Sequence, residues 1–438
     1  MILAAVLVSM AFGQSPGPAL WVALCSNSAS SPADGLTTYE APDGRVQTTH
    51  VAATAPVGCV ATPLPIAYED VVWVRLVAPA TTNRLSRGLI LLGGDGVPSS
   101  GSEIVLPDET SQAPTQVSAV SSNRSSALSE GQPPIRAMWA WRPELWRSEA
   151  SSLFARASSW NVGVLYVSVQ VGADGALVDA DRLRAFLRDA GDRRLRVWAV
   201  EGDPRAVMEA ERTAMVQRAR AIRSFNAAGS PGFDGVQYDI EPYLVPGYAL
   251  NEEQWNEAYV ATIEQLRKAA AMPVEVAVPF WWLNARTADG RVMDRVSAFI
   301  ESVAVMDYRT DPDTIERLAE PWLDWGEAHK RRIRVALEAG RLPDEPRYHF
   351  RPAPSGTLLQ IKIGDRDALV LVRAPYANRS GAAFRLIRTS TFEASTVTFF
   401  GRAGNLRSLL PTLERRFSGY GSFAGIALHE VPPPDAAR

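Results

Sequence analysis

The sequence predicts an α/β fold: a (β/α)8 TIM barrel preceded by a small all-β module and carrying a β insertion between its seventh and eighth strands. Three observations lead to this prediction. Short apolar runs separated by turn residues fill the N-terminal part, apolar runs alternate with amphipathic stretches after Pro134, and period-two runs appear late in the chain. A length of 438 residues fits roughly two or three domains.

The composition is that of a folded protein with no strong charge. The 45 basic and 48 acidic side chains leave a net charge of −3, whereas a nucleic-acid interface shows as a basic stripe. Charged residues make up 21% of the chain and aromatic residues 8%, which are ordinary globular values. We therefore expect no nucleic-acid partner. The 12 Trp residues are the one excess.

The chain begins with an apolar run over residues 1–12. A run of this length is typical of a signal peptide and is too short to cross a bilayer, although a buried first strand is an alternative. We therefore predict a signal peptide at 1–16 and a secreted or periplasmic protein. Cys25 and Cys59 are the only cysteines and would be able to pair in an exported chain. No later segment has about 20 uninterrupted apolar residues, so no membrane span is expected.

Residues 17–108 predict the small all-β module. Short apolar runs such as 20–24, 71–76 and 89–92 are separated by Gly, Pro, Asp and Asn, which is the pattern of strands and turns. Residues 109–134 are instead rich in Ser, Gln and Pro. Such a segment buries too little apolar area to fold, so we interpret it as a linker.

Residues 135–438 predict the barrel, because apolar strands alternate with amphipathic helices as in successive βα units. An open doubly wound sheet is the alternative, but no Gly-x-Gly-x-x-Gly follows the first strand. The predicted strands are 135–141, 162–171, 196–201, 235–241, 274–282, 302–309, 332–338 and 423–430, and helical patterns occupy 180–190, 205–225, 252–270 and 406–417.

The interval at about 345–395 departs from this alternation. Its period-two runs at 359–363 and 369–372 flank Gly364 and three charged residues, which is a hairpin signal. An insertion here extends from the loops that follow the barrel strands, where barrel enzymes bind substrates. Contact with a substrate and a purely decorative role are both open.

The most informative segment is GFDGVQYDIEP at 232–242. Because side chains alternate along a strand, Gln237, Asp239 and Glu241 point the same way, and Glu241 lies at the C-terminal end of the barrel. Two carboxylates on one face repel, so Asp239 should raise the proton affinity of Glu241, as a general acid near neutral pH requires. A surface strand with alternating acids is the alternative, against which the apolar Val236 and Ile240 on the other face argue.

The stretch 234–241 resembles the Asp-Gly-x-Asp-x-Asp-x-Glu signature of chitinase-type (family 18) glycoside hydrolases. Met306-Asp307-Tyr308 likewise resembles the Met-x-Tyr element of that family. The resemblance covers the barrel and implies that Glu241 is the acid/base that protonates the glycosidic oxygen. It further implies that Asp239 orients a substrate N-acetyl group acting as nucleophile, and that Tyr308 hydrogen-bonds to this group.

Two positions depart from the family pattern. Gln237 stands where the family has its first buried Asp, and Arg309 stands where it usually has Asp. These departures favour a second hypothesis, a non-catalytic carbohydrate-binding protein on a glycosidase-like barrel. A structural or adhesion role led by the β module is a third hypothesis.

Glu338 offers a different catalytic geometry at the end of the seventh predicted strand. Ile240-Glu241-Pro242 is similar to the Asn-Glu-Pro string of the large clan of retaining glycosidases, whose acid follows strand four and whose nucleophilic Glu ends strand seven. Carboxyl groups about 5–5.5 Å apart would then support a covalent glycosyl intermediate. A loop or ion-pair role for Glu338 is equally open.

Polar and aromatic residues at the other strand ends are candidates for substrate binding. Sugar rings pack on aromatic planes, whereas core packing is the alternative for each Trp. The four His residues show no metal-ligand spacing, so we expect neither a metal nor a cofactor. We predict an exported, retaining glycoside hydrolase that acts on a polysaccharide or cell-wall glycan. Its candidate substrate-binding residues are Trp139, Trp141, Gln237, Trp281, Trp282, Asp307, His429 and Glu430.

Overall fold

The computed structural model describes residues 134–432 apart from 246–247, 249–251, 365 and 379–380. Before residue 134 it describes 20–26, 35–40, 46–52, 59–64, 66, 70–77 and 89–92. The predicted signal peptide at 1–16 and nearly all of the predicted linker lie outside the described residues.

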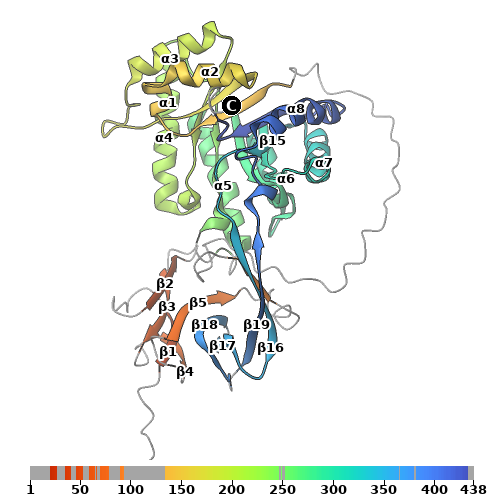
Figure 1. The fold of residues 1–438 in the computed structure, drawn as a ribbon. Helices are drawn as coiled ribbons and strands as arrows, with labels where there is room; N and C mark the ends of the chain where they lie inside the picture. Colours follow the sequence, from red (N-terminus) through yellow and green to blue (C-terminus); the bar gives the residue numbers. More distant parts are fainter. Residues whose placement is uncertain are drawn as a thin grey trace, which may run out of the picture. The chain divides into compact units, whose positions relative to one another are not determined.

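A closed ring of eight parallel strands forms the barrel (Figure 1). The (β/α)8 prediction is confirmed, and each predicted strand corresponds to one strand of the ring. Six of the eight strands are shorter than predicted. The largest differences are in the second, fourth, fifth and sixth, which end at Ser168, Tyr238, Pro279 and Met306. In chain order the strands are β7 (Arg136–Ala140), β8 (Val162–Ser168), β9 (Arg196–Glu201), β10 (Gly235–Tyr238), β11 (Val274–Pro279), β14 (Ser302–Met306), β15 (Arg332–Glu338) and β20 (Phe423–His429).

Helices cover the outside of the ring (Figure 1). They pack apolar faces, such as Leu183 and Leu187 of the third helix, against the strands. No helix in the described part of the chain is both long and apolar enough to span a membrane. The helices are α1 (Glu144–Arg147), α2 (Ala150–Ser159), α3 (Ala180–Asp192), α4 (Glu209–Ala227), α5 (Glu252–Ala270), α6 (Val292–Val296), α7 (Pro312–His329) and α8 (Ala403–Phe417).

Short 3-10 turns and one small ribbon connect these elements. Two of the turns directly follow barrel strands and so shape the end of the barrel: η4 comes after β10, and η6 comes after β11. The turns are η3 (Pro204–Val207), η4 (Pro242–Leu244), η6 (Phe280–Asn284), η7 (Ser297–Phe299) and η8 (Ala394–Thr396), and the ribbon pairs β12 (Arg286–Thr287) with β13 (Gly290–Arg291).

The chain divides into two compact units. One contains the barrel, and the other joins the strands before residue 90 to residues 349–388. The second unit therefore combines the predicted N-terminal module with most of the predicted insertion. Its first sheet has the order β2-β3-β1-β4, from β1 (Leu20–Ser26), β2 (Gly35–Glu40), β3 (Val46–Ala52) and β4 (Cys59–Leu64).

The insertion strands belong to a six-stranded sheet of order β5-β18-β17-β19-β16-β6. β18 pairs antiparallel with β5, so that Val370 lies opposite Val74, a pairing that the sequence pattern does not indicate. Cys59 is disulfide-bonded, and its backbone lies opposite that of Cys25. The strands are β5 (Val71–Val77), β6 (Leu89–Leu92), β16 (Glu345–Ala353), β17 (Gly356–Ile363), β18 (Arg366–Tyr376) and β19 (Ala382–Phe392).

Candidate active site

The four predicted catalytic residues lie at one end of the barrel, which we call the mouth. Asp239 and Glu241 follow β10, Tyr308 follows β14, and Glu338 ends β15. All strands of the ring are parallel, so their carboxyl ends meet on the same side. Burial first, and then the charges of Glu338, Asp239 and Glu241, raise the pKa of Tyr308 well above its ordinary value. The phenol therefore stays neutral and lies within electrostatic range of all three carboxyl groups.

Asp239 and Glu241 form an interacting pair of acids. Burial and the charge of Glu241 raise the pKa of Asp239 to about 8, although His429 opposes this. The Asp239 Oδ1 atom is buried and has no hydrogen-bond partner within the described part of the chain. Burial also raises the pKa of Glu241. Burial first, and then the charge of Glu241 acting on Asp239, disfavour double ionisation, so the pair holds a proton near neutral pH.

Tyr243 contacts the predicted acid directly, and sequence reasoning missed it. Its hydroxyl donates a hydrogen bond to Oε2 of Glu241 at 2.7 Å. This bond favours the ionised form of Glu241 and opposes the effect of burial on its pKa. The η4 turn positions Tyr243, with Pro242 starting the turn directly after Glu241. The ring packs edge-on against Trp281, with ring centroids 4.9 Å apart.

Gly202 allows Trp141 to approach the pair of acids. A Cβ atom at this position would lie 2.7 Å from the carbonyl oxygen of Asp239 and 3.4 Å from Cη2 of Trp141. A side chain here would clash with the Asp239 carbonyl oxygen, so the backbone at the end of β10 would have to shift. Trp141 is half-buried, so it contributes an aromatic surface beside the Asp239 backbone.

Glu338 and His429 form a second polar pair at the mouth. They lie opposite each other on the neighbouring strands β15 and β20, and Glu338 Oε2 is 2.7 Å from His429 Nδ1. The other oxygen, Oε1, accepts a hydrogen bond from the backbone N–H of Gly340 at 2.5 Å. Burial would raise the pKa of Glu338, but these hydrogen bonds and the His429 charge hold it below its ordinary value. Glu338 is therefore ionised, and both of its oxygens are engaged.

A buried polar network fills the barrel below the mouth. Trp139 Nε1 donates to Gln237 Oε1 at 2.5 Å, and Gln237 Nε2 donates to Glu275 Oε1 at 2.6 Å. Glu275 also accepts hydrogen bonds from Tyr166, Ser302 and Arg334. An ionised Asp in place of Gln237 would repel the Glu275 carboxylate and offer it no donor. The network thus gives a physical reason for the departure from the family pattern at Gln237.

Four of the predicted substrate-binding residues are buried: Trp139, Gln237, Trp282 and Asp307. Gln237 has no exposed surface and engages both ends of its amide in the network. Trp282 is also fully buried and packs against Tyr259 at 4.6 Å between ring centroids. Asp307 is fully buried, and neither of its carboxyl oxygens has a hydrogen-bond partner within the described part of the chain. Substrate contact by these residues stays a prediction.

The predicted substrate-binding residues differ in exposure. Trp281 is 44% exposed, and Glu430 is also exposed. Trp139 is 6% exposed, with its ring edge-on to His429 at 5.8 Å between centroids. Within the described part of the chain, no group of three or more His, Cys, Asp or Glu side chains is arranged to hold a metal ion.

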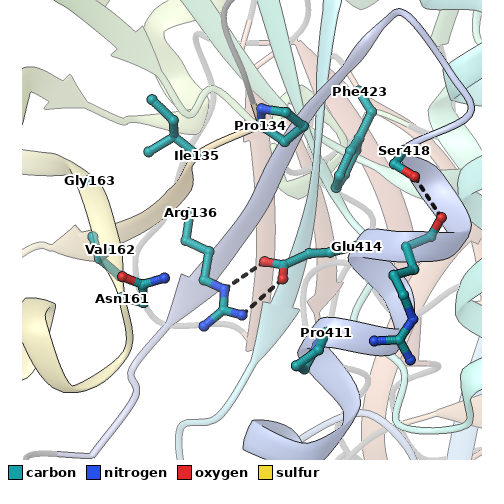
Figure 2. Close-up of a pocket in the computed structure, with 11 residues that line it drawn as sticks. Pro134, Ile135, Arg136, Asn161, Val162, Gly163, Pro411, Glu414, Ser418 and Phe423 are labelled. Atoms are coloured by element: carbon teal, nitrogen blue, oxygen red, sulfur yellow. Dashed lines mark hydrogen bonds and ion pairs between the residues drawn. The ribbon is translucent and has the colours of Figure 1, made fainter.

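A cavity of about 640 Å³ opens at the opposite end of the barrel (Figure 2). It is lined by the starts of β7, β8 and β20 and by the end of α8. Arg136 and Glu414 point toward each other across it and form a two-point ion pair, with N···O distances of 2.6 and 2.9 Å (Figure 2). None of the predicted site residues lines this cavity, so we do not assign the catalytic chemistry to it.

The chain is similar in structure to barrel glycosidases. A chitinase from Chromobacterium violaceum is 14% identical, covering 67% of this chain and 93% of that one, with a TM-score of 0.37. The spore cortex-lytic enzyme SleL from Bacillus cereus is 12% identical over 69% of this chain and 72% of that one, with a TM-score of 0.38. A GH113 β-1,4-mannanase is 12% identical, covering 68% of this chain and 88% of that one, with a TM-score of 0.38. No family model matches the chain, and no curated protein matches its sequence. The barrel fold is established by the closed ring of strands itself.

Proposed function

We propose that this protein is an exported, retaining glycoside hydrolase that acts on a polysaccharide or cell-wall glycan, with Glu241 as the general acid/base. The observation that carries the proposal is the position of Glu241 at the mouth. It is hydrogen-bonded by Tyr243 and shares its titration with the buried Asp239. The disulfide at Cys59 supports export, because disulfides persist in oxidising compartments.

In this proposal the two acids have complementary roles. Protonated Glu241 gives its proton to the glycosidic oxygen as the bond from this oxygen to the anomeric carbon breaks. The oxygen of a substrate N-acetyl group, oriented by Asp239, forms the new bond to that carbon. Water then displaces this oxygen and returns a proton to Glu241. The Tyr243 hydroxyl stabilises the Glu241 carboxylate between the two steps.

Glu338 is the other possible nucleophile, through a covalent glycosyl ester. Its two oxygens already accept hydrogen bonds from the Gly340 backbone and the His429 ring, which lowers their reactivity. We therefore favour the route through Asp239. If that route operates, Asp239→Asn abolishes turnover and Glu338→Gln does not.

The proposal is tested by comparing wild type with Glu241→Gln on chitin oligosaccharides, peptidoglycan and mannan. The substitution keeps the shape and removes the proton donor, so turnover should fall about 10²- to 10⁴-fold. Glu264→Gln is the matched control, because Glu264 pairs with Lys268 on the surface of α5. Equal release of reducing ends by wild type and Glu241→Gln would refute the proposal.

A non-catalytic carbohydrate-binding protein is the second candidate, and Gln237 and Arg309 favour it. Arg309 lies over the Phe280 ring, 4.7 Å from its centroid, and donates to the Tyr308 carbonyl oxygen. It therefore cannot replace the acid that the family has at this position. This candidate predicts glycan binding in calorimetry with no product at any pH, and an unchanged affinity in Glu241→Gln.

A further inference from the structure

The pair formed by Glu338 and His429 has a defined geometry that the proposed acid/base step does not use. The residues are register partners on β15 and β20, joined at 2.7 Å between Glu338 Oε2 and His429 Nδ1. The Glu338 side chain is 5% exposed and that of His429 is 24% exposed. The carboxylate is thus the buried member of the pair, and the imidazole is the member that reaches the mouth.

Aromatic neighbours fix the orientation of the His429 ring. Tyr308 stacks on it, with ring centroids 6.3 Å apart and an interplanar angle of 25°. Trp139 meets it edge-on, 5.8 Å away and at 70°. Because Nδ1 is bound to Glu338, the second nitrogen, Nε2, points away from the carboxylate. A carboxylate on Nδ1 is the common device that fixes the tautomer and orientation of an imidazole.

The charges around His429 favour its protonated form. Glu338 faces His429 from β15, and Glu430 follows it in the chain. Asp239, which follows β10, also raises the pKa of His429. The charge of His429 in turn lowers the pKa of Glu241. Tyr308 from β14 stays neutral. Burial lowers the pKa of His429, but the hydrogen bond to Glu338 and the surrounding acids outweigh burial and raise it.

The effect also runs from His429 to the acid pair. A positive charge on the imidazole lowers the pKa of Asp239 and that of Glu241, in both cases against the larger effect of burial. It therefore stabilises the state in which the two acids share a single proton, because the remaining negative charge has a cation facing it.

We propose that Glu338 is a positioning residue that holds His429 as an imidazolium facing the Asp239–Glu241 pair, and that Glu338 forms no bond to the sugar. The effect on Glu241 as an acid rests on the proposed function. The role of Glu338 in holding His429 does not rest on the proposed function.

The first test follows the titration of His429 by NMR in the full chain. The four His residues give few imidazole signals, and the loss of one in His429→Gln assigns His429. Glu338→Gln should lower the midpoint of the His429 titration by about one pH unit or more, a tenfold change in proton affinity. Glu338→Asp, which keeps the negative charge, should lower the midpoint of the His429 titration less than Glu338→Gln does.

Glu430→Gln is the control, because it removes an exposed neighbouring charge that, within the described part of the chain, acts on the ring through its charge and not through a hydrogen bond. It should shift the midpoint less than Glu338→Gln does. The other three His signals report whether each variant stays folded. An unchanged His429 midpoint in folded Glu338→Gln would overturn the proposal, whether or not the protein hydrolyses any glycan.

The second test uses turnover. Glu338→Gln should remain active with both limbs of its pH–rate profile moved to higher pH, because the acid pair loses a facing cation. Wild type incubated with 2-deoxy-2-fluoroglucosyl or 2-deoxy-2-fluoromannosyl fluoride should show no added mass on the Glu338 peptide. A covalent adduct on Glu338 would overturn the proposal. Absence of turnover in wild type would refute the proposed function alone, since the NMR titration still decides the role of Glu338.

Discussion

Substitution of Arg334 by Met should strongly destabilise the barrel. The Arg334 side chain is 8% exposed, and its Nε atom lies 3.3 Å from Oε2 of Glu275, which is itself 2% exposed. One terminal nitrogen also donates to the carbonyl oxygens of Ile135, at 2.6 Å, and Ala424, at 3.1 Å. Arg334 thus connects the charge of Glu275 to the start of the ring at β7 and β20.

The expected loss follows from what the substitution leaves behind. Removing one partner of a buried ion pair costs about 3–5 kcal/mol, because the other charge stays buried and uncompensated. Tyr166, Ser302 and Gln237 still donate to Glu275, which keeps the cost within that range. Adding Glu275→Gln removes the orphaned charge, so the double variant should recover most of the stability.

Urea unfolding followed by Trp fluorescence measures this effect. Only Trp21 and Trp73 of the 12 Trp precede the barrel, so the signal reports mainly on barrel unfolding. With a slope of about 2–3 kcal/mol per M, the midpoint should fall by about 1–2 M. Arg182→Met, at an exposed site on α3, is the control. A loss below about 1 kcal/mol in Arg334→Met, or a double variant as unstable as the single one, would refute the reasoning.

Three further predictions concern single residues. Tyr243→Phe removes the hydrogen bond to Glu241 and so raises the pKa of that acid. The alkaline limb of the pH profile of kcat/KM should move to higher pH by about one unit. A limb at the wild-type pH would contradict this role of Tyr243. Burial raises the pKa of Asp307 to about 8 against the opposing charges of Arg309 and Arg317, so protonation favours the folded state. The free energy of unfolding of the wild type should therefore fall as pH rises from about 4 to 8. Urea titrations between pH 5 and 9 should show a flatter pH dependence of this free energy in Asp307→Asn. The same pH dependence in both proteins would show that Asp307 does not titrate in this range. Trp281→Ala removes an exposed aromatic face and should weaken glycan binding about 5- to 10-fold in calorimetry without lowering the urea midpoint, whereas equal affinity would exclude it from the binding surface.

Local periodicity accounts for the parts of the site that sequence predicts well. The alternation of apolar and polar residues after Pro134 indicates βα units, and the observed ring confirms them. The same alternation places Asp239 and Glu241 on one face, and the two acids do interact. Tyr308 packs against the residues inside the barrel, as expected of a residue that follows β14 into the mouth.

Contacts between distant segments account for what sequence reasoning missed. Gln237 meets Glu275 on the next strand of the ring, and no local pattern around either residue indicates that pairing. The insertion strand β18 pairs with β5, roughly 300 residues earlier, although each segment by itself reads only as a strand. Tyr243 reaches Glu241 because β10 ends early and the η4 turn folds back, which is a feature of backbone path.

The sequence by itself determined the fold class, the succession of strands and helices along the barrel and the shared face of Asp239 and Glu241, because these depend on propensity and periodicity within a few residues. The tertiary structure decided which strand ends are neighbours. Closing the ring brings β20 beside both β15 and β7, and this places His429 between Glu338, Tyr308 and Trp139. The protonation state of each acid depends on such neighbours and on burial, and both exist only once the barrel has closed.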